Sequence, residues 1–320
     1  LIIPTIVVSG EITVSDVRNF LKEYEVNDFF SKEDFASQDK AFVESVEKIL
    51  NAKQHQQASR GNAVNQVQND AVLGLKNSYA LLIGIADYLH INRLNKTTID
   101  ASDTYHTLAQ NGYQNANMHL LKDKQANKVT ITNEFNWLAD SAEVDDTVFI
   151  FFSGHSMQKT GGLNAGEYLC PVEANLNDLE NSCISSKEFA MVLRSIRANR
   201  VVVFLDISHS GGISETKAGN SHVLAGLSEA VFNLLAEQEG RVIIASCKPD
   251  EDSRELPDMR NSLFTHYLLE GLRGSAARID GTVPIIRLFD YISDKVPQHR
   301  SQHPFIKSAA ENFIVAMSTK

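Results

Sequence analysis

The sequence predicts an α/β fold in which a mostly parallel sheet carries helices on both faces. Residues 147–152 and 201–205 form apolar runs typical of strands that are buried on both sides. Strand-like runs alternate with segments of helical 3–4 spacing, and such alternation is typical of parallel sheets with crossover helices. Both apolar runs end abruptly in polar and glycine residues, at the edge where open α/β sheets usually carry their sites.

The other elements of this sheet are expected in chain order from Asn77 onward. Runs rich in β-branched and other apolar residues predict strands at 79–85, 118–121, 241–246 and 313–316. Apolar residues spaced three or four apart predict helices around 101–108, 131–142, 189–196, 264–272 and 286–292. Ser185 and Glu188 predict a capping box before the third of these helices. A long irregular stretch is expected between Phe152 and Tyr168.

Three segments are expected: a small helical unit at 1–53, a linker at 54–76 and the main domain at 77–320. Ser15 can cap a first helix, and apolar residues mark one face of each of two helices: Val17, Phe20, Leu21 and Tyr24, then Phe42, Val46, Ile49 and Leu50. The linker is rich in Gln, Asn, Ala and Ser. The first unit is either a scaffold extension or a recruitment or sensing module for an activating partner, and the sequence leaves both open.

Composition and charge exclude several classes of function. The net charge of −10 argues against nucleic-acid binding as the main role. It fits a preference for basic peptides, although acidic proteins of ordinary function are common. No apolar run approaches the roughly 20 residues that span a bilayer, and no basic leader precedes Leu1, so we expect a cytoplasmic protein without membrane contact.

The three cysteines indicate neither a metal site nor a disulfide framework. Cys170, Cys183 and Cys247 lack metal-ligand spacing, and an odd number does not suit paired disulfides. Cys170 and Cys247 lie in apolar segments, which predicts packed core residues. We expect no cofactor from these residues.

Two motifs at the ends of the buried strands carry the chemistry. Ser153, Gly154 and His155 follow the first strand, and the second runs into the sequence Asp-Ile-Ser-His-Ser-Gly-Gly at 206–212. Here the chain resembles the caspase-like cysteine peptidases, most closely the metacaspases and their bacterial relatives. The resemblance covers about 77–317 and includes the segments 82–85, 99–101, 167–171, 245–246, 253–255 and 263–265.

The resemblance implies a Cys/His mechanism. His155 matches the catalytic base, and the backbone N–H groups of Gly154 and Ser208 match oxyanion donors. Gly211 and Gly212 would let backbone N–H groups approach the substrate. His209 matches a motif residue that is not the base, and a structural role is favoured for it.

Ser208 stands where the family has the nucleophilic Cys. A serine hydroxyl is not ionised at neutral pH, so the base must supply all the activation. Loss of a peptidase nucleophile costs on the order of a million-fold in turnover, and we expect this chain to be nearly inactive. Three explanations stay open: an introduced substitution of Cys by Ser, a natural pseudopeptidase, or a true serine enzyme. The intact motif around Ser208 favours the first.

The resemblance also implies specificity for Arg or Lys. In metacaspases two acids line the primary pocket, and here they match Asp100 and Asp206. A carboxylate pair suits a guanidinium group, because each carboxylate accepts its N–H donors. Asp100 has a second interpretation as a helix N-terminal acid.

Processing and metal binding are weaker expectations. Lys217, in the expected loop 213–220, and Arg60, in the linker, are candidate autoprocessing sites, and an ordinary solvated loop explains the former equally well. Asp250, Glu251 and Asp252 could bind the calcium that some relatives need, but such a run is more often a solvated face.

Through this family resemblance, the sequence predicts an endopeptidase acting on proteins after a basic residue, in a regulated bacterial defence or cell-death pathway. The alternative is a pseudopeptidase that binds basic peptides or scaffolds a partner.

Overall fold

The computed structural model describes residues 77–161, 165–207, 213–214, 221–224, 227–249, 251, 253, 255–299 and 301–318, with the backbone alone at 213–214 and 221–224. The expected helical unit at 1–53 and the linker at 54–76 lie outside the described residues. Arg60, Ser208, His209, Gly211, Gly212 and Lys217 lie outside them as well.

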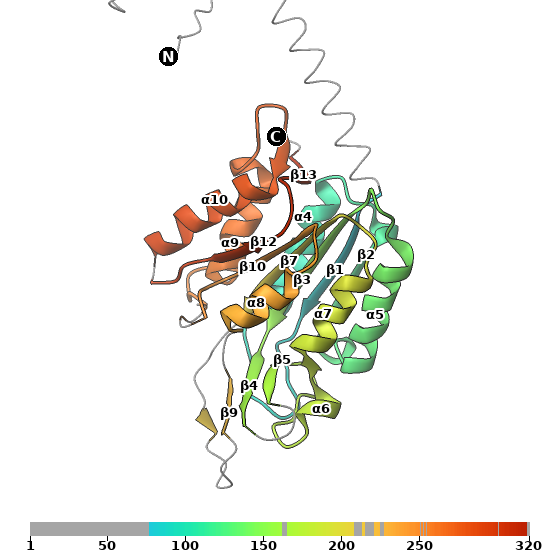
Figure 1. Ribbon diagram of the computed structural model, residues 1–320. Coiled ribbons are helices and arrows are strands. Elements are labelled where there is room, and N and C mark those ends of the chain that lie inside the picture. The colour runs from blue at the N-terminus through green and yellow to red at the C-terminus, as the bar shows by residue number, and fades with distance from the viewer. Residues whose placement is uncertain are drawn as a thin grey trace, which may run out of the picture. The chain divides into compact units, whose positions relative to one another are not determined.

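A six-stranded sheet forms the centre of the described domain (Figure 1). Its order is β12-β10-β7-β3-β1-β2, and every neighbouring pair is parallel except β10 with β12. The strands are β1 (Tyr79–Gly84), β2 (Met118–Lys122), β3 (Thr147–Gly154), β7 (Arg200–Ile207), β10 (Arg241–Ala245) and β12 (Phe305–Ser308). The mostly parallel sheet predicted from the sequence is confirmed, and the antiparallel edge strand β12 is an addition to it.

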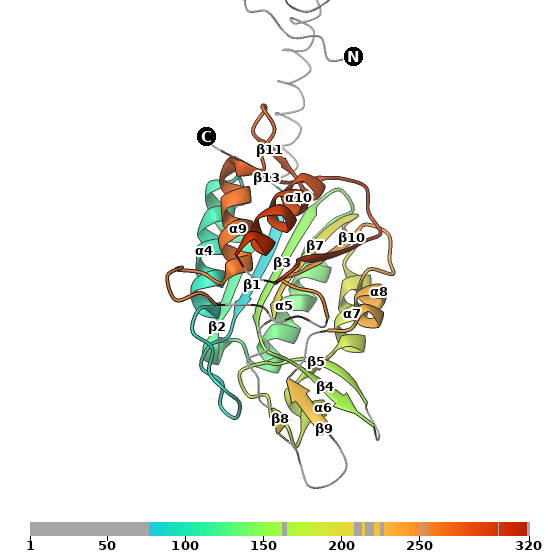
Figure 2. The same cartoon turned by 90° about the vertical axis from the view of Figure 1, so that its left-hand side faces the viewer.

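Helices cover both faces of this sheet, as the sequence predicts. One face carries α5 (Lys128–Ser141), α7 (Ser186–Ser195) and α8 (Glu229–Leu235) (Figures 1 and 2). The other carries α4 (Thr97–Gln110), α9 (Leu263–Glu270) and α10 (Ile285–Lys295). The shorter helical turns are η1 (Asn115–Asn117), η2 (Asp123–Gln125), α6 (Leu179–Ser182), η3 (Gly271–Ser275) and η4 (Val296–Gln298). None of the helices in the described part is long and apolar enough to cross a membrane.

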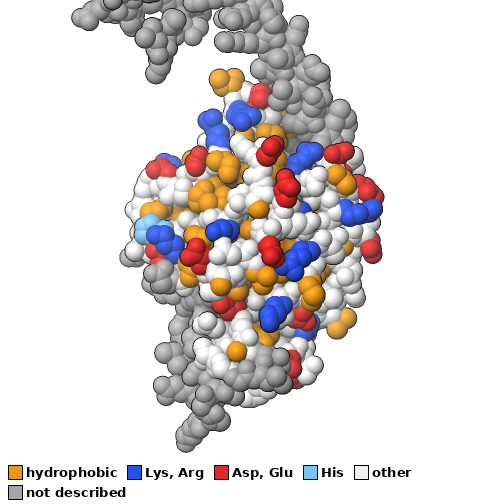
Figure 3. All heavy atoms as spheres, in the orientation of Figure 1, with side chains coloured by type: hydrophobic (Ala, Val, Ile, Leu, Met, Phe, Trp, Pro, Cys, Tyr) orange, Lys and Arg blue, Asp and Glu red, His pale blue; other side chains and the backbone are white. Residues whose placement is uncertain are grey.

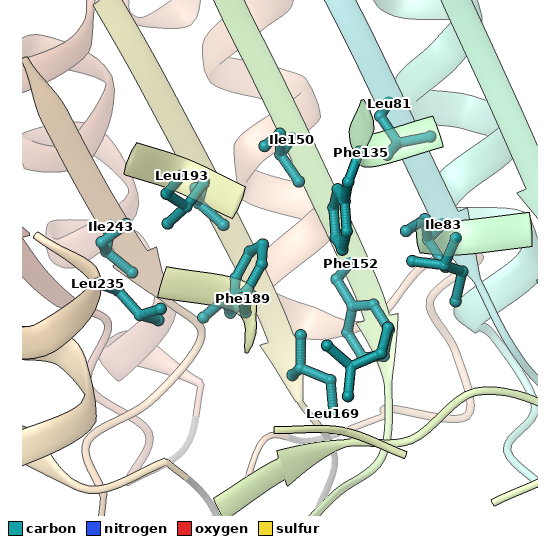
Figure 4. Close-up of a cluster of buried hydrophobic side chains, with 14 of the residues drawn as sticks. Leu81, Ile83, Phe135, Ile150, Phe152, Leu169, Phe189, Leu193, Leu235 and Ile243 are labelled. Carbon is teal, nitrogen blue, oxygen red and sulfur yellow. The ribbon is translucent and has the colours of Figure 1, made fainter. Parts of the chain in front are cut away.

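The central strands are apolar on both faces because each face packs against a helical layer. In β3, Ile150 and Phe152 point into the core under α5 and α7 (Figure 4), whereas Phe149 and Phe151 face α4 and α9. All eight residues of β3 are buried. Burial of one such side chain contributes about 1.5–3 kcal/mol, so these strands hold the ends that carry the site at fixed positions.

Local signals at α7 are confirmed in detail. The Ser185 hydroxyl accepts a hydrogen bond from the Glu188 N–H at 3.2 Å, and the Glu188 carboxylate accepts one from the Ser185 N–H at 2.7 Å. At the C-terminal end of α7, the buried Arg241 side chain donates to the carbonyl oxygens of Leu193, Ile196 and Ala198. A cation at a helix C-terminus interacts favourably with the helix dipole, and burial lowers the pKa of Arg241 to about 10.

The expectation of an irregular stretch between Phe152 and Tyr168 is wrong. Two strands, β4 (Ser156–Thr160) and β5 (Gly166–Leu169), fall within it or overlap it. They belong to a five-stranded antiparallel sheet of order β6-β5-β4-β9-β8, with β6 (Ile184–Ser185), β8 (Ile213–Ser214) and β9 (Ser221–Leu224). Residues 213–214 of the predicted loop at 213–220 are therefore a strand, and 215–220 lie outside the described residues. The mostly polar residues 156–160 form a strand because β5 on one side and distant β9 on the other supply the hydrogen-bond partners.

The last predicted strand exists but lies outside the main sheet. β13 (Ile314–Met317) pairs antiparallel with β11 (Thr282–Pro284) in a separate two-stranded sheet.

Surface charge is mixed on the face seen in Figure 3, where Lys and Arg side chains alternate with Asp and Glu. No patch of one sign is gathered on that face.

Candidate active site

His155 follows the last residue of β3 directly and is fully buried. Its Nε2 lies 2.9 Å from the carbonyl oxygen of Asn92. A carbonyl only accepts hydrogen bonds, so Nε2 carries the proton in this contact, and in a neutral imidazole the lone pair is then on Nδ1. Nδ1 is therefore the nitrogen able to act as a base.

The loop between β1 and α4 supplies both groups that hold His155. Besides the Asn92 carbonyl, the Tyr88 hydroxyl accepts a hydrogen bond from the His155 backbone N–H at 2.8 Å. The Tyr88 and His155 rings lie 5.0 Å apart between centroids, tilted by 43°. Burial and nearby negative groups raise the pKa of Tyr88 well above its ordinary value, so the phenol stays protonated.

Acidic side chains hold this loop at both ends. At its start, Asp123 Oδ1 accepts from the N–H groups of Ala86 and Asp87 at 2.8 and 2.9 Å. At its end, Glu255 Oε1 accepts from the N–H groups of Asn95 and Lys96 at 3.3 and 3.0 Å. Between these anchors, the Leu89 N–H donates to the Val172 carbonyl at 2.9 Å.

Asp100 and Asp206, the predicted pocket acids, are both buried and lie together. Ser262 joins them, because its N–H donates to Asp100 Oδ1 at 3.1 Å and its hydroxyl donates to Asp206 Oδ2. Asn261 also donates to Asp100, at 2.9 Å. Ser253 and Thr265 donate to Asp206 at 2.8 and 2.7 Å. Apart from Ser246, which also hydrogen-bonds to Asp206, the side chains that hold the two acids come from the segment 253–265.

The electrostatics of this pair are unfavourable without a cation. Burial, together with the neighbouring Asp206, raises the pKa of Asp100 well above its ordinary value. Burial also raises the pKa of Asp206, while hydroxyl donors oppose the shift. Asp100 Oδ2 is buried and has no hydrogen-bond partner, and no Lys or Arg among the described residues pairs with either acid. The arrangement is thus suited to receive a cation.

The strand register brings the ends of β3 and β7 to one edge of the sheet. Gly154 at the end of β3 pairs with Ile207 at the end of β7. His155 and Ser208 are therefore the next residues beyond neighbouring parallel strands, as the sequence predicts, although the side chain of Ser208 lies outside the described residues. Gly154 is fixed at the end of β3, and its role as an oxyanion donor stays a prediction.

The structure describes fewer of the residues that the sequence suggests for metal binding and for cleavage of the chain. Among the described residues, no group of three or more His, Cys, Asp or Glu side chains could hold a metal ion. Asp250 and Asp252 lie outside them, and Glu251 accepts from the His303 N–H at 2.6 Å. The candidate cleavage sites Lys217 and Arg60 are likewise not described. All three cysteines are buried, as expected for Cys170 and Cys247.

Sequence reasoning missed the residues that support the site. Tyr88, Asn92, Asp123, Asn261 and Ser262 carry no motif of their own, and all of them except Asn261 act through a backbone group or on one. One signal was available: Thr265 belongs to a segment of family resemblance, 263–265, whose place beside Asp206 only the fold reveals.

Comparison with known proteins defines the class. The caspase domain family model matches residues 77–314, so the chain belongs to this family of cysteine peptidases. Protein GSU0716 from Geobacter sulfurreducens has a similar fold, with a TM-score of 0.50 and 16% identity over 73% of this chain and 94% of that chain. No curated protein matches the sequence significantly.

Proposed function

We propose that this chain is an endopeptidase of the metacaspase type that cleaves protein substrates after Arg or Lys. The single observation that carries the specificity is the pair of buried carboxylates, Asp100 and Asp206, joined by Ser262. An Arg guanidinium or Lys ammonium would bind between charges that are otherwise uncompensated. An acidic residue there would add a third negative charge, so cleavage after Asp is disfavoured.

His155 is the proposed base in this mechanism. With Nε2–H donated to the Asn92 carbonyl, Nδ1 would take a proton from the nucleophile and later pass it to the leaving amine. The nucleophile comes from position 208 and the oxyanion donors from the backbone of Gly154 and residue 208. No metal or cofactor takes part in these steps.

Ser208 makes the present chain a poor catalyst. Cys at this position would be partly thiolate near neutral pH, whereas Ser depends on the base alone. We propose that the chain is an inactive form of a cysteine enzyme that works in the cytoplasm, within a regulated defence or cell-death pathway. Control would come from a partner at the 1–53 unit or from cleavage at Lys217 or Arg60, and these elements rest on family resemblance.

The test is the full chain carrying Ser208→Cys, assayed on matched peptides in which Arg, Lys or Asp precedes the bond to be cleaved. Cleavage of the Arg and Lys peptides alone, abolished by His155→Ala, is the expected result. Calcium, and prior nicking at Arg60 or Lys217, are varied so that a missing activation step does not hide activity. Cleavage of the Asp peptide, or of none under any condition, contradicts the proposal.

A natural pseudopeptidase is the second candidate, and Ser208 itself is the observation that favours it. Such a protein keeps the acid pair as a binding site for basic peptides without catalysis. It predicts that the unaltered chain binds a peptide ending in Arg and that Ser208→Cys restores no cleavage. Calorimetric titration of that peptide into the unaltered chain and the Asp100→Asn variant measures the binding.

A further inference from the structure

We infer that Tyr88 is a positioning residue that sets the orientation of the His155 imidazole, and that Asp123 holds Tyr88 in place. The inference deepens the proposed function, because it concerns the base of the same site. It rests on hydrogen bonds and packing around the β1–α4 loop, and neither residue contacts the acid pair through any bond described above.

The first observation is that Tyr88 touches His155 in two ways. Its hydroxyl accepts from the His155 backbone N–H at 2.8 Å, and its ring packs against the imidazole with centroids 5.0 Å apart. The backbone contact fixes where His155 leaves β3, and the ring contact limits rotation of the side chain. Together with the Asn92 carbonyl on Nε2, they leave the imidazole one orientation.

Gly154 provides a second, independent observation. A Cβ built at Gly154 would lie 2.5 Å from the Tyr88 hydroxyl oxygen, closer than such atoms approach, and 3.2 Å from the Phe152 ring. The glycine before His155 therefore leaves the space that the Tyr88 hydroxyl occupies. A side chain at position 154 would displace the hydroxyl from the His155 N–H.

Asp123 determines where the loop begins. Its Oδ1 accepts from two consecutive N–H groups, those of Ala86 and Asp87, which lie two residues and one residue before Tyr88. The Ala86 carbonyl then accepts from the N–H groups of Tyr88 and Leu94, which closes the loop around Tyr88 and Asn92. Asp123 itself has φ of 43°, a left-handed conformation that non-glycine residues adopt only where surrounding contacts impose it.

Nitrogen NMR of His155 tests the inference without any need for catalysis. Full-length protein with Ser208 retained and labelled histidine is compared with the Tyr88→Phe, Asp123→Ala and Gly154→Ala variants, and a His155→Gln sample assigns the resonances. We expect the unaltered chain to show His155 protonated at Nε2, and each variant to shift it toward a mixture of the two neutral forms. Asp123→Asn keeps an oxygen acceptor and should restore most of the original spectrum.

Two control variants remove equivalent groups elsewhere. Tyr113→Phe deletes a buried hydroxyl that donates to the Val315 carbonyl at 3.1 Å. Asp146→Ala deletes a carboxylate that accepts from the Glu143 N–H at 2.8 Å. Both should lower thermal stability as Tyr88→Phe and Asp123→Ala do, but leave the His155 resonances in place. Unchanged His155 resonances in Tyr88→Phe and Asp123→Ala would overturn the inference.

Kinetics in the Ser208→Cys background give a second readout. Misplacement of a catalytic group by a fraction of an ångström should lower kcat about ten- to a hundredfold with KM nearly unchanged, because the acid pair is untouched. If kcat/KM fell by the same factor because KM rose, the result would contradict a positioning role. If Ser208→Cys cleaves no peptide, the proposed function fails, while the NMR comparison still decides the inference.

Discussion

His155 and Asp206 come from neighbouring strands and Asp100 from helix α4, yet the histidine and the two acids are held by different kinds of contact. His155, beyond β3, is held by a carbonyl and a hydroxyl of the β1–α4 loop. Asp206, near the end of β7, is held by side-chain hydroxyls of Ser253, Ser262 and Thr265. Asp100 belongs to the second group, because its partners Asn261 and Ser262 come from the same segment.

The difference follows from the chemistry of the groups. A neutral imidazole can be oriented by one acceptor on one nitrogen, which leaves the other nitrogen to act as a base. Buried carboxylates need several donors, and even then burial keeps the pKa of both acids raised. His155 is thus held by contacts that orient its ring, whereas burial disfavours the charged forms of Asp100 and Asp206, which a basic ligand would stabilise.

Loss of the base gives the largest expected effect. In the Ser208→Cys background, His155→Ala should lower kcat by about 10²–10⁴-fold, because no other group replaces the base. Peptide cleavage under saturating substrate measures it. His119→Ala, at a histidine whose ring stacks on Trp137 at 3.7 Å between centroids, is the control and should retain activity. Equal activity in both variants would remove His155 from the mechanism.

Asp100 and Asp206 should act on substrate recognition. Asp100→Asn leaves one carboxylate to face the basic group, and loss of one partner of a buried charge pair costs about 2–5 kcal/mol, or at least about thirtyfold in kcat/KM for an Arg peptide. Asp103→Asn, three residues along the same helix, is the matched control because Asp103 already pairs with Arg260 at 2.7 Å. If both variants lose activity alike, the pocket assignment is wrong.

Removal of one hydroxyl donor sharpens the comparison further. Thr265→Val keeps the shape of the side chain but deletes the donor to Asp206 Oδ2 at 2.7 Å. Hydrogen bonds to charged groups contribute about 1.5–3 kcal/mol, and urea unfolding should show a loss of this size. Thr282→Val, which deletes a donor to partly exposed Asp280, should cost less. A larger loss at Thr282 would contradict the special role of the buried acids.

The pH dependence of stability should have opposite signs at two acids of α4. The pKa of Asp100 is raised by burial and by Asp206, so its contribution to stability is full below the unfolded pKa and is lost as pH rises through the folded pKa. Hydrogen bonding to Arg260 lowers the pKa of Asp103, so its contribution is present above the unfolded pKa and is lost as pH falls.

Urea unfolding at pH about 4 and about 8 measures both effects, since the unfolded pKa of Asp is about 3.9. Relative to the unaltered chain, Asp100→Asn should gain stability toward the higher pH, whereas Asp103→Asn should lose it. This is the smallest of the four expected effects, because Asp103 is partly exposed to solvent. The same sign in both variants would contradict the electrostatic difference between the acids.

The sequence by itself determined five of the six strands of the main sheet and the edge at which the candidate residues of β3 and β7 lie. The apolar runs at 147–152 and 201–205 specify strands buried on both sides, and local pairs such as Ser185 with Glu188 specify a helix start. Parallel strands end at one edge, so motifs that follow two such strands must meet there. This is why His155 and Asp206 could be assigned to one edge of the sheet without a structure.

Only the tertiary structure decided what holds these residues. The five-stranded sheet was missed because residues 156–160 become a strand through pairing with distant β9. Tyr88, Asn92 and Asp123 were missed because they act on or through the backbone, which carries the same N–H and C=O groups at nearly every residue and leaves no mark in the side-chain pattern. Contacts between segments far apart in the chain depend on packing, and packing is a property of the whole fold.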